Sequence, residues 1–488
     1  MMTDMKPESS RDSDKYVAAL VNAASSLAPA PGLMVANTRV RGEAASQADP
    51  YNAVVRWVDV QSLDDGPLRG VRFSLKDSIA ISGIPLTAGS VALRDFVPSG
   101  DATVTHRLLE AGATIVATTN MDDLAFSGAG DTSAYGPVLN PHDPSRLAGG
   151  SSGGAAASLF LDGIDVALGT DQGGSVRLPA AWTGTYGIKP TFGRIPYTGI
   201  VGMDARLDHV GILARSPQLI SRTLAVLTGP DGWDARQSSA YEAASTSSRD
   251  INPGERPITV RVVGSAMDRA EPRIREALEM RLGDWARRGV AVEQSDLDLT
   301  THGPISTAIF LEGARATLNG LSAPWTGRYF FWEELHRALA RGVASNFEEL
   351  SAPVRYSILA AQHLQATNPG TAFGRGLAAR DALVDDVKAA LAGADFLVLP
   401  TSPVDALAIS PHITDVERTS RGWDVLANTG AFNVTGHPAL SIPIDTPGLP
   451  VGAMLVARHH HDEELLAFAC WSSEGADLQR DPSTQGRP

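Results

Sequence analysis

Apolar and polar positions alternate along this chain in short strand-like and helix-like stretches. Residues 71–77 alternate like a strand that ends in charge. Residues 103–111 have the spacing of an amphipathic helix that Gly112 ends, and residues 114–118 indicate a buried strand. This strand–helix–strand order is typical of a mainly parallel sheet with helices on its faces.

The same alternation continues toward the C-terminal end. Residues 300–380 have a mostly helical pattern and many aromatic side chains. Because no linker interrupts the pattern, we predict one large α/β domain, with a central mixed, mainly parallel, twisted β-sheet covered by helices on both faces. Further strands are predicted at residues 166–170, 258–263, 395–400, 439–443 and 451–457, and further helices at 155–161 and 271–288.

The first 60 residues are predicted to form an N-terminal helical segment, and residues 61–488 the α/β domain. Residues 16–38 carry no charge, but acidic and basic residues are mixed before them, so the positive start of a signal peptide is missing. Polar residues and prolines within this stretch also argue against a membrane span. We expect a short packing helix here, in a cytoplasmic protein that does not bind a membrane.

Composition narrows the classes of function. Of 488 residues, 41 are Lys or Arg and 55 are Asp or Glu, which gives a formal net charge of −14. A chain this acidic repels a phosphate backbone, so we expect no nucleic-acid partner. Cys470 is the only cysteine, which excludes an internal disulfide framework and a cysteine-rich metal site. We expect neither a metal nor a cofactor.

Two glycine–serine clusters are the strongest candidates for a reactive site. Residues 149–154 are Gly-Gly-Ser-Ser-Gly-Gly, and residues 169–175 are Gly-Thr-Asp-Gln-Gly-Gly-Ser. The second cluster follows a predicted strand, so its turn allows several backbone N–H groups to converge on an oxyanion, and Ser175 ends that turn. The first fits the nucleophile-elbow pattern around Ser152, but no strand precedes it, which disfavours that interpretation.

A nucleophilic serine needs a base that accepts its proton. Neither cluster contains a histidine, and the whole chain has only five lysines. One of these, Lys76, stands at the end of a predicted strand. A lysine accepts a proton only when it is neutral, so its use as a base requires that burial lower the pKa of Lys76.

Together these residues resemble the amidase signature family. The resemblance covers most of the chain and includes Lys76 and both clusters at their spacing in the sequence. It implies the amidase signature fold, with a catalytic core at about residues 70–215 and a variable helical region at about 300–380 that builds the substrate pocket. Further shared stretches lie at residues 119–123, 136–141, 187–191, 207–211, 433–439 and 449–452.

By that resemblance, Ser175 is the nucleophile, Lys76 the base, and Ser151 a bridging serine. The peptide bond between Gly150 and Ser151 is cis in the family. The resemblance implies that protons pass from Ser175 through Ser151 to Lys76. The aromatic stretch at residues 325–332 is first interpreted as part of the core, and the alternative is that it forms the wall of an apolar acyl pocket.

The resemblance also implies the residues that surround this triad. We expect Asp171 and Arg177 to pair and to shape the turn, and Ser152 to support its loop by hydrogen bonding rather than to react. The residues expected to form the oxyanion hole and to bind substrate are Gln172, Gly173, Gly174, Ala125 and Ser127.

Within the family, the sequence most resembles actinobacterial enantioselective amidases, which hydrolyse primary amides to acid and ammonia. We therefore expect an amidohydrolase that forms a seryl acyl-enzyme from a small-molecule amide with an apolar or aryl acyl group. Hydrolysis of N-substituted amides or carbamates is the second interpretation. The third is the glutaminase subunit of a tRNA-dependent amidotransferase, which typically has threonine where this chain has Gln172. A homodimer is one possible assembly.

Overall fold

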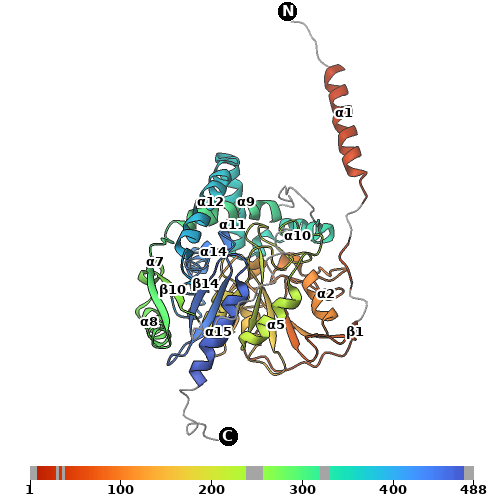
Figure 1. The fold of residues 1–488 in the computed structure, drawn as a ribbon. Helices are drawn as coiled ribbons and strands as arrows, with labels where there is room; N and C mark the ends of the chain where they lie inside the picture. The colour runs from red at the N-terminus through yellow and green to blue at the C-terminus, as the bar shows by residue number, and fades with distance from the viewer. Residues whose placement is uncertain (1–7, 29–31, 36–38, 238–255, 319–329, 478–488) are drawn as a thin grey trace, which may run out of the picture.

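A twelve-stranded β-sheet forms the centre of the structure (Figure 1). The structure is a computed structural model that describes residues 8–28, 32–35, 39–237, 256–318 and 330–477. A separate small sheet pairs β5 (Leu139–Asn140) with β6 (Asp143–Leu147). In spatial order, the strands of the large sheet are β1 (Arg39–Arg41), β2 (Val54–Ser62), β4 (Thr114–Thr119), β3 (Arg72–Lys76), β7 (Val166–Asp171), β9 (His209–Ala214), β8 (Tyr186–Lys189), β13 (Ala439–Ile444), β14 (Val451–Val456), β12 (Phe396–Pro400), β10 (Ile258–Val263) and β11 (Val290–Ser295).

The sheet is mixed, as predicted, but antiparallel pairs outnumber parallel ones. Among the described strands, β3 pairs in parallel with β4 and β7, and β10 with β11 and β12. The other seven pairings are antiparallel. The expectation of a mainly parallel sheet is therefore corrected. Its physical reason is the short connections in the second half of the core: a six-residue loop joins β13 to β14, and such a loop permits only antiparallel neighbours.

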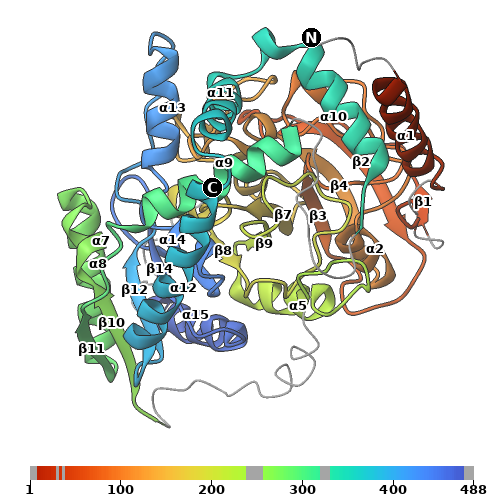
Figure 2. The same ribbon diagram turned by 90° about the horizontal axis from the view of Figure 1, so that it is seen from above.

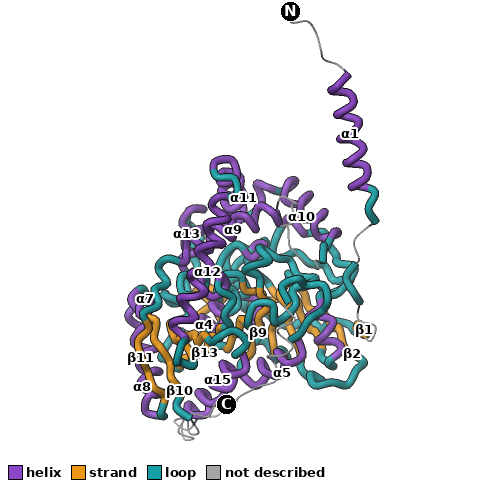
Figure 3. The backbone as a smooth tube through the Cα atoms, turned by 45° about the horizontal axis from the view of Figure 1, so that its top comes forward, coloured by secondary structure: helices purple, strands orange, loops and turns teal. Residues whose placement is uncertain are grey.

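Side chains alternate between two apolar cores on opposite faces of the sheet. In β7, Val166 and Leu168 pack into one core and Ala167 into the other. Helices therefore cover both faces, as the sequence predicts (Figure 3). The first face carries α2 (Thr103–Glu110), α5 (Pro217–Leu227), α8 (Pro272–Arg287) and α15 (Asp462–Asp477), and the second carries α3 (Gly153–Ser158) and α4 (Arg177–Thr183).

A further group of helices gathers at one end of the strands (Figures 1 and 2). The described residues between 300 and 380 are mainly helical, as predicted. This group consists of α9 (His302–Leu318), α10 (Glu333–Ser345), α11 (Ala352–Thr367), α12 (Thr371–Leu391), α13 (Asp415–Asp424) and α14 (Ala431–Val434). The remaining short elements are α7 (Gly264–Asp268), η1 (Val91–Leu93), η2 (Asp123–Ala125) and η3 (Phe347–Glu349).

The N-terminal segment differs from the expected packing helix. Helix α1 (Glu8–Ser25) begins earlier than predicted and projects away from the sheet, with Tyr16 and Leu20 exposed (Figure 1). The periodicity of a sequence predicts a helix but not the surface against which it packs. Strand β2 crosses the expected boundary at residues 60/61, because its alternating pattern runs from Val54 to Ser62. The sheet therefore begins before that boundary.

A buried carboxylate ties α15 to the loop after β8. Asp462, the first residue of α15, accepts hydrogen bonds from the backbone N–H and the hydroxyl of Thr191, both at 2.7 Å. It also pairs with Nη1 of Arg194 at 2.7 Å. Burial by itself would raise the pKa of Asp462, but Arg194 and Thr191 hold that pKa below its usual value. The ionised carboxylate is therefore part of the packing.

We predict that Asp462→Ala lowers the free energy of unfolding by about 3 kcal/mol or more, because it leaves Arg194 and Thr191 buried without this acceptor. Glu463→Gln is the matched control: Glu463 also pairs with Arg194, but its side chain is 35% exposed, so the loss should be below about 1 kcal/mol. Urea unfolding followed by circular dichroism measures both. Equal losses in the two variants would contradict the assignment.

Candidate active site

The two glycine–serine clusters meet at the carboxyl ends of β3 and β7. These strands pair in parallel, so Lys76 at the end of β3 and Asp171 at the end of β7 lie at the same edge of the sheet. Lys76 Nζ donates to Ser151 Oγ at 2.7 Å and to Thr170 Oγ1 at 2.8 Å. The peptide bond between Gly150 and Ser151 is cis, as the resemblance implies.

The Lys76 amine is fully buried. Burial lowers its pKa from 10.5 to about 7, although the carboxylates of Asp122, Asp171 and Asp208 act in the opposite direction. A pKa lowered in this direction is what the use of Lys76 as a base requires. Near neutral pH a large fraction of Lys76 is an uncharged amine, which has the lone pair that a base needs.

Ser175 lies on the turn between β7 and α4. Its carbonyl accepts a hydrogen bond from the Ser152 N–H at 3.1 Å, and its side chain lines a cavity while remaining only 2% exposed. The hydroxyl of Ser175 has no hydrogen-bond partner among the described residues. The structure thus joins Lys76 to Ser151 but contains no hydrogen bond between Ser151 and Ser175.

Thr429 fixes the direction of the peptide groups in this turn. Its hydroxyl donates to the Gly173 carbonyl at 2.5 Å. Because C=O and N–H point in opposite directions in a trans peptide, the Gly174 N–H points away from Thr429. No described backbone carbonyl accepts the N–H groups of Gly173, Gly174 or Ser175. These donors are therefore available for an oxyanion.

Buried hydrogen bonds hold both loops in place. Arg177 and Asp171 form the predicted pair, with Nη2 to Oδ1 at 2.9 Å and Nε to Oδ2 at 3.0 Å, and Asn433 donates to the same carboxylate at 2.9 Å. Burial would raise the pKa of Asp171, but Arg177 and Asn433 overcome it and hold the pKa far below the usual value. The Ser152 hydroxyl donates to the Thr170 carbonyl at 3.1 Å, which fits a supporting role.

A cavity of about 520 Å³ opens beside Ser175; we call it the catalytic cavity. Gln172 and Gly173 lie on its wall next to Ser175. Arg269 and Asp424 are its charged lining residues. Its described apolar and aromatic walls come mainly from α9, α11, α13 and nearby loops, and consist of Ala125, Met203, Leu207, Leu299, Phe310, Leu311, Tyr356, Ala360, Trp423, Leu426 and Ala427.

Two of the expected substrate contacts are not found on the described wall of the catalytic cavity. Ala125 lines the catalytic cavity, but Ser127 is not part of its described wall; the Ser127 hydroxyl accepts from the Ala129 N–H at 3.1 Å. Within the aromatic stretch at 325–332, residues 325–329 lie outside the described residues, and residues 330–332 line a different cavity. A run of aromatic residues in the sequence does not show on which side of α9, and so in which cavity, its side chains will lie.

Sequence reasoning also missed the main aromatic walls of the catalytic cavity. Phe310 on α9 and Trp423 on α13 contact each other, with ring centroids 4.8 Å apart. Each is a single aromatic residue in a helical stretch, so the sequence holds no signal that separates it from an ordinary core residue. No three His, Cys, Asp or Glu side chains in the described ranges are grouped to hold a metal ion. No described helix has the length and apolar character needed to cross a membrane.

In this fold a buried lysine donates a hydrogen bond to one serine, and a second serine lies on a turn whose N–H groups have no described acceptor. These features are those of an amide-hydrolysing α/β enzyme. The chain belongs to the Amidase family, whose model matches residues 28–466. It is 32% identical over 427 residues to the A subunit of the glutamyl-tRNA(Gln) amidotransferase of Haloarcula marismortui, covering 85% of this chain and 98% of that protein.

Solved structures are similar over the same region. A crystal structure described as an amidase has a TM-score of 0.68 and 28% identity, covering 84% of this chain and 85% of that one. The 6-aminohexanoate cyclic dimer hydrolase, solved with its substrate, has a TM-score of 0.73 and covers 87% of this chain and 90% of that one. At 24% identity, the second likeness shows a shared fold only.

We predict that kcat/KM rises with pH through about 7 and then reaches a plateau, because only uncharged Lys76 accepts a proton. Lys76→Ala should lower kcat about 10²- to 10⁴-fold, and Lys76→Arg should not restore it, since a guanidinium stays protonated. Lys388→Ala is the control, because that side chain is 59% exposed. An active arginine variant, or a flat profile between pH 5 and 9, would show that Lys76 is not the base.

We predict that Gly174→Ala lowers kcat about 10²- to 10³-fold, the scale of losing an oxyanion donor. Gly174 has φ +141°, and a Cβ there would lie 2.1 Å from Thr429 Oγ1, so the turn must shift. Gly283→Ala on α8 is the control, since it lies outside the site and a Cβ there would meet only Arg287 Nη1, at 3.6 Å. Kinetics on one amide decide, with unfolding curves to confirm folding. Equal loss in both variants would contradict this geometry.

Proposed function

We propose that the protein hydrolyses primary amides of apolar or aryl-bearing acids to the acid and ammonia. The observation that carries the proposal is the catalytic cavity, where Ser175 and Gly173 adjoin walls that include Phe310 and Trp423. An amide carbonyl at Ser175 would place its acyl group against these rings. Burial of apolar acyl groups there contributes about 0.8 kcal/mol for each CH₂.

In the proposed reaction, Ser175 Oγ attacks the amide carbon and the negative charge collects on the carbonyl oxygen near the N–H groups of Gly173 and Gly174. The Ser175 proton passes to Ser151, whose own proton passes to Lys76. This transfer requires Ser175 and Ser151 to come within hydrogen-bond distance, a contact of the kind that often tightens only when substrate binds. Return of the proton to nitrogen releases ammonia, and water then hydrolyses the seryl ester.

The leaving group distinguishes the two hydrolase interpretations. Ammonia requires no further pocket, whereas an anilide or a carbamate would require space for a second apolar group. The catalytic cavity is large enough that its volume alone does not reject N-substituted amides. The proposal therefore ranks primary amides first and N-substituted amides second.

A glutaminase is the further candidate, and it has more support than the sequence alone provides. The relative from Haloarcula marismortui is the A subunit of a glutamyl-tRNA(Gln) amidotransferase. Arg269 and Asp424 both line the catalytic cavity, and such a pair can bind the carboxylate and the ammonium of an amino-acid amide. Against this candidate, most of the wall is apolar and aromatic.

We predict that benzamide exceeds acetamide in kcat/KM by roughly 10², because its acyl group has about five more carbons and the burial of about three or four of them is enough for that factor. Benzamide should also exceed acetanilide and glutamine when the purified chain acts alone. All four substrates are measured under one condition, with Ser175→Ala as the control, which should lose about 10³-fold or more in kcat on each. Glutamine as the best substrate would select the glutaminase, and acetanilide as the best would select the N-substituted class.

A further inference from the structure

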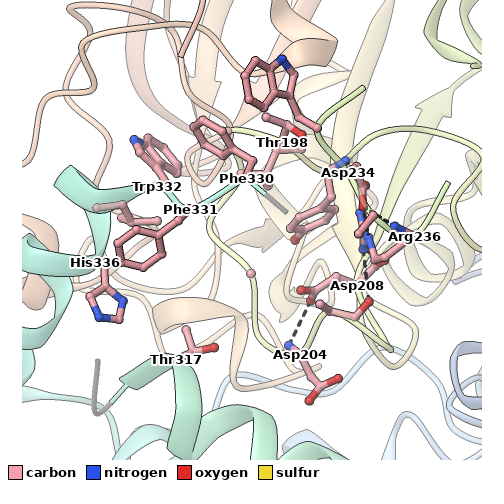
Figure 4. A pocket seen from close by; sticks show the side chains of 18 of the residues that line it. Thr198, Asp204, Asp208, Asp234, Arg236, Thr317, Phe330, Phe331, Trp332 and His336 are labelled. Atoms are coloured by element: carbon pink, nitrogen blue, oxygen red, sulfur yellow. Dashed lines mark hydrogen bonds and ion pairs between the residues drawn. The ribbon is translucent and has the colours of Figure 1, made fainter. Parts of the chain in front are cut away.

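A second cavity lies beside α9, with a volume of about 180 Å³; we call it the aromatic cavity. Phe330, Phe331 and Trp332 lie on one side of it, and Asp208 and Asp204 on the other (Figure 4). Its described lining shares no residue with that of the catalytic cavity. The mechanism proposed above gives none of these side chains a contact with substrate or a proton-transfer step. Two of them lie near the catalytic residues: the Asp208 charge acts on the pKa of Lys76, and the Tyr197 hydroxyl accepts a hydrogen bond from Gln172 at 2.8 Å.

Helix α9 separates the two cavities. Gly313, Ala316 and Thr317 line the aromatic cavity, whereas Phe310 and Leu311 line the catalytic cavity. The loop before β9 also contributes to both cavities. Asp204 and Asp208 line the aromatic cavity, whereas Met203 and Leu207 line the catalytic cavity. A ligand in the aromatic cavity would therefore contact side chains that a substrate at Ser175 does not contact.

One carboxylate of the aromatic cavity, that of Asp208, forms no described ion pair, although Arg236 Nη1 donates to the Asp208 backbone carbonyl at 2.8 Å. Arg236 pairs with Asp234, and Arg206 pairs with Asp204. Asp208 forms no ion pair in the described part of the chain; its oxygens accept the Met203 N–H at 3.0 and 3.2 Å and the Asp204 N–H at 3.4 Å. Burial, partly offset by Arg236, raises the pKa of Asp208 to about 7. A cation next to Asp208 would remove that cost of ionisation.

A second polar group is also left without a partner at this cavity. Thr198 lines it, is 9% exposed, and its Oγ1 is buried without a hydrogen-bond partner among the described residues. Buried hydroxyls in native structures usually have a partner, so an unsatisfied one indicates a group that binds there.

The opposite wall is suited to a cation with an apolar body. The rings of Trp233 and Phe330 pack edge to face with centroids 6.1 Å apart, and Trp233 remains 37% exposed, so the wall reaches the surface. Aromatic faces attract cations, and Arg236 already lies 5.0 Å above the ring of Tyr197 in this cavity. Carboxylate on one side and rings on the other select a positive charge attached to an apolar group.

We propose that the aromatic cavity is a binding site for a small primary ammonium ion with an aromatic or aliphatic body. The ammonium donates to the Asp208 carboxylate, and the body packs against Phe330, Phe331 and Trp233. This proposal does not depend on which amide the catalytic cavity accepts.

Calorimetric titration of the full chain with benzylammonium tests the proposal, with benzyl alcohol and benzoate as neutral and anionic analogues. Benzylammonium should bind at least about tenfold more tightly than either, because only the cation pairs with a buried carboxylate. Asp208→Asn should weaken its binding about tenfold or more, and Trp233→Leu roughly three- to tenfold. The partly exposed Trp233 keeps the test valid if the Asp208 variant does not fold.

The catalytic cavity has a matched pair of side chains, Trp423 and Asp424, which supplies the controls. Trp423→Leu and Asp424→Asn should leave benzylammonium binding unchanged. Three results would overturn the proposal: no binding, equal binding of benzyl alcohol or benzoate, or loss of binding in the Trp423 and Asp424 variants instead of the Asp208 and Trp233 variants.

Discussion

Burial of a single amine is the constraint on which the rest of the site depends. Lys76 is removed from water completely, yet it must stay within hydrogen-bond distance of Ser151. A buried ammonium is unfavourable, so the same burial that costs stability makes the uncharged base available at neutral pH. The sheet makes this possible because the parallel pair β3 and β7 delivers Lys76 and Thr170 to one edge.

Three carboxyl groups act on the pKa of Lys76, and their own ionisation decides how strongly they raise it. If all were fully ionised, Asp122, Asp171 and Asp208 would favour the ammonium form of Lys76. Burial raises the pKa of Asp122 and of Asp208 to about 7 each, which reduces their negative charge near neutral pH. Asp171 stays ionised, but Arg177 pairs with its charge. The negative charge that would raise the pKa of Lys76 is therefore limited. The Asp171–Arg177 pair also holds the turn before Ser175 in place.

The sequence predicts this site better than it predicts its surroundings. Lys76 and Ser175 could be found because glycine clusters and a rare lysine are local signals, whereas Ser151 is assigned from the family resemblance alone. The antiparallel pairing in the second half of the sheet could not be found, because pairing depends on contacts between distant segments. The positions of Phe310 and Trp423 on the wall of the catalytic cavity depend on how helices pack, which their spacing in the chain does not record.

The central claim is that Lys76 is an uncharged amine near neutral pH, and NMR titration of lysines labelled with ¹³C at Cε tests it directly. The chain has only five lysines, so each signal can be assigned with single Lys→Met variants. If Lys76 is uncharged near neutral pH, one signal, absent in Lys76→Met, titrates near pH 7. A Lys76 signal that titrates near the ordinary lysine value of about 10.4 would mean that the residue is a structural ammonium, and would contradict the account.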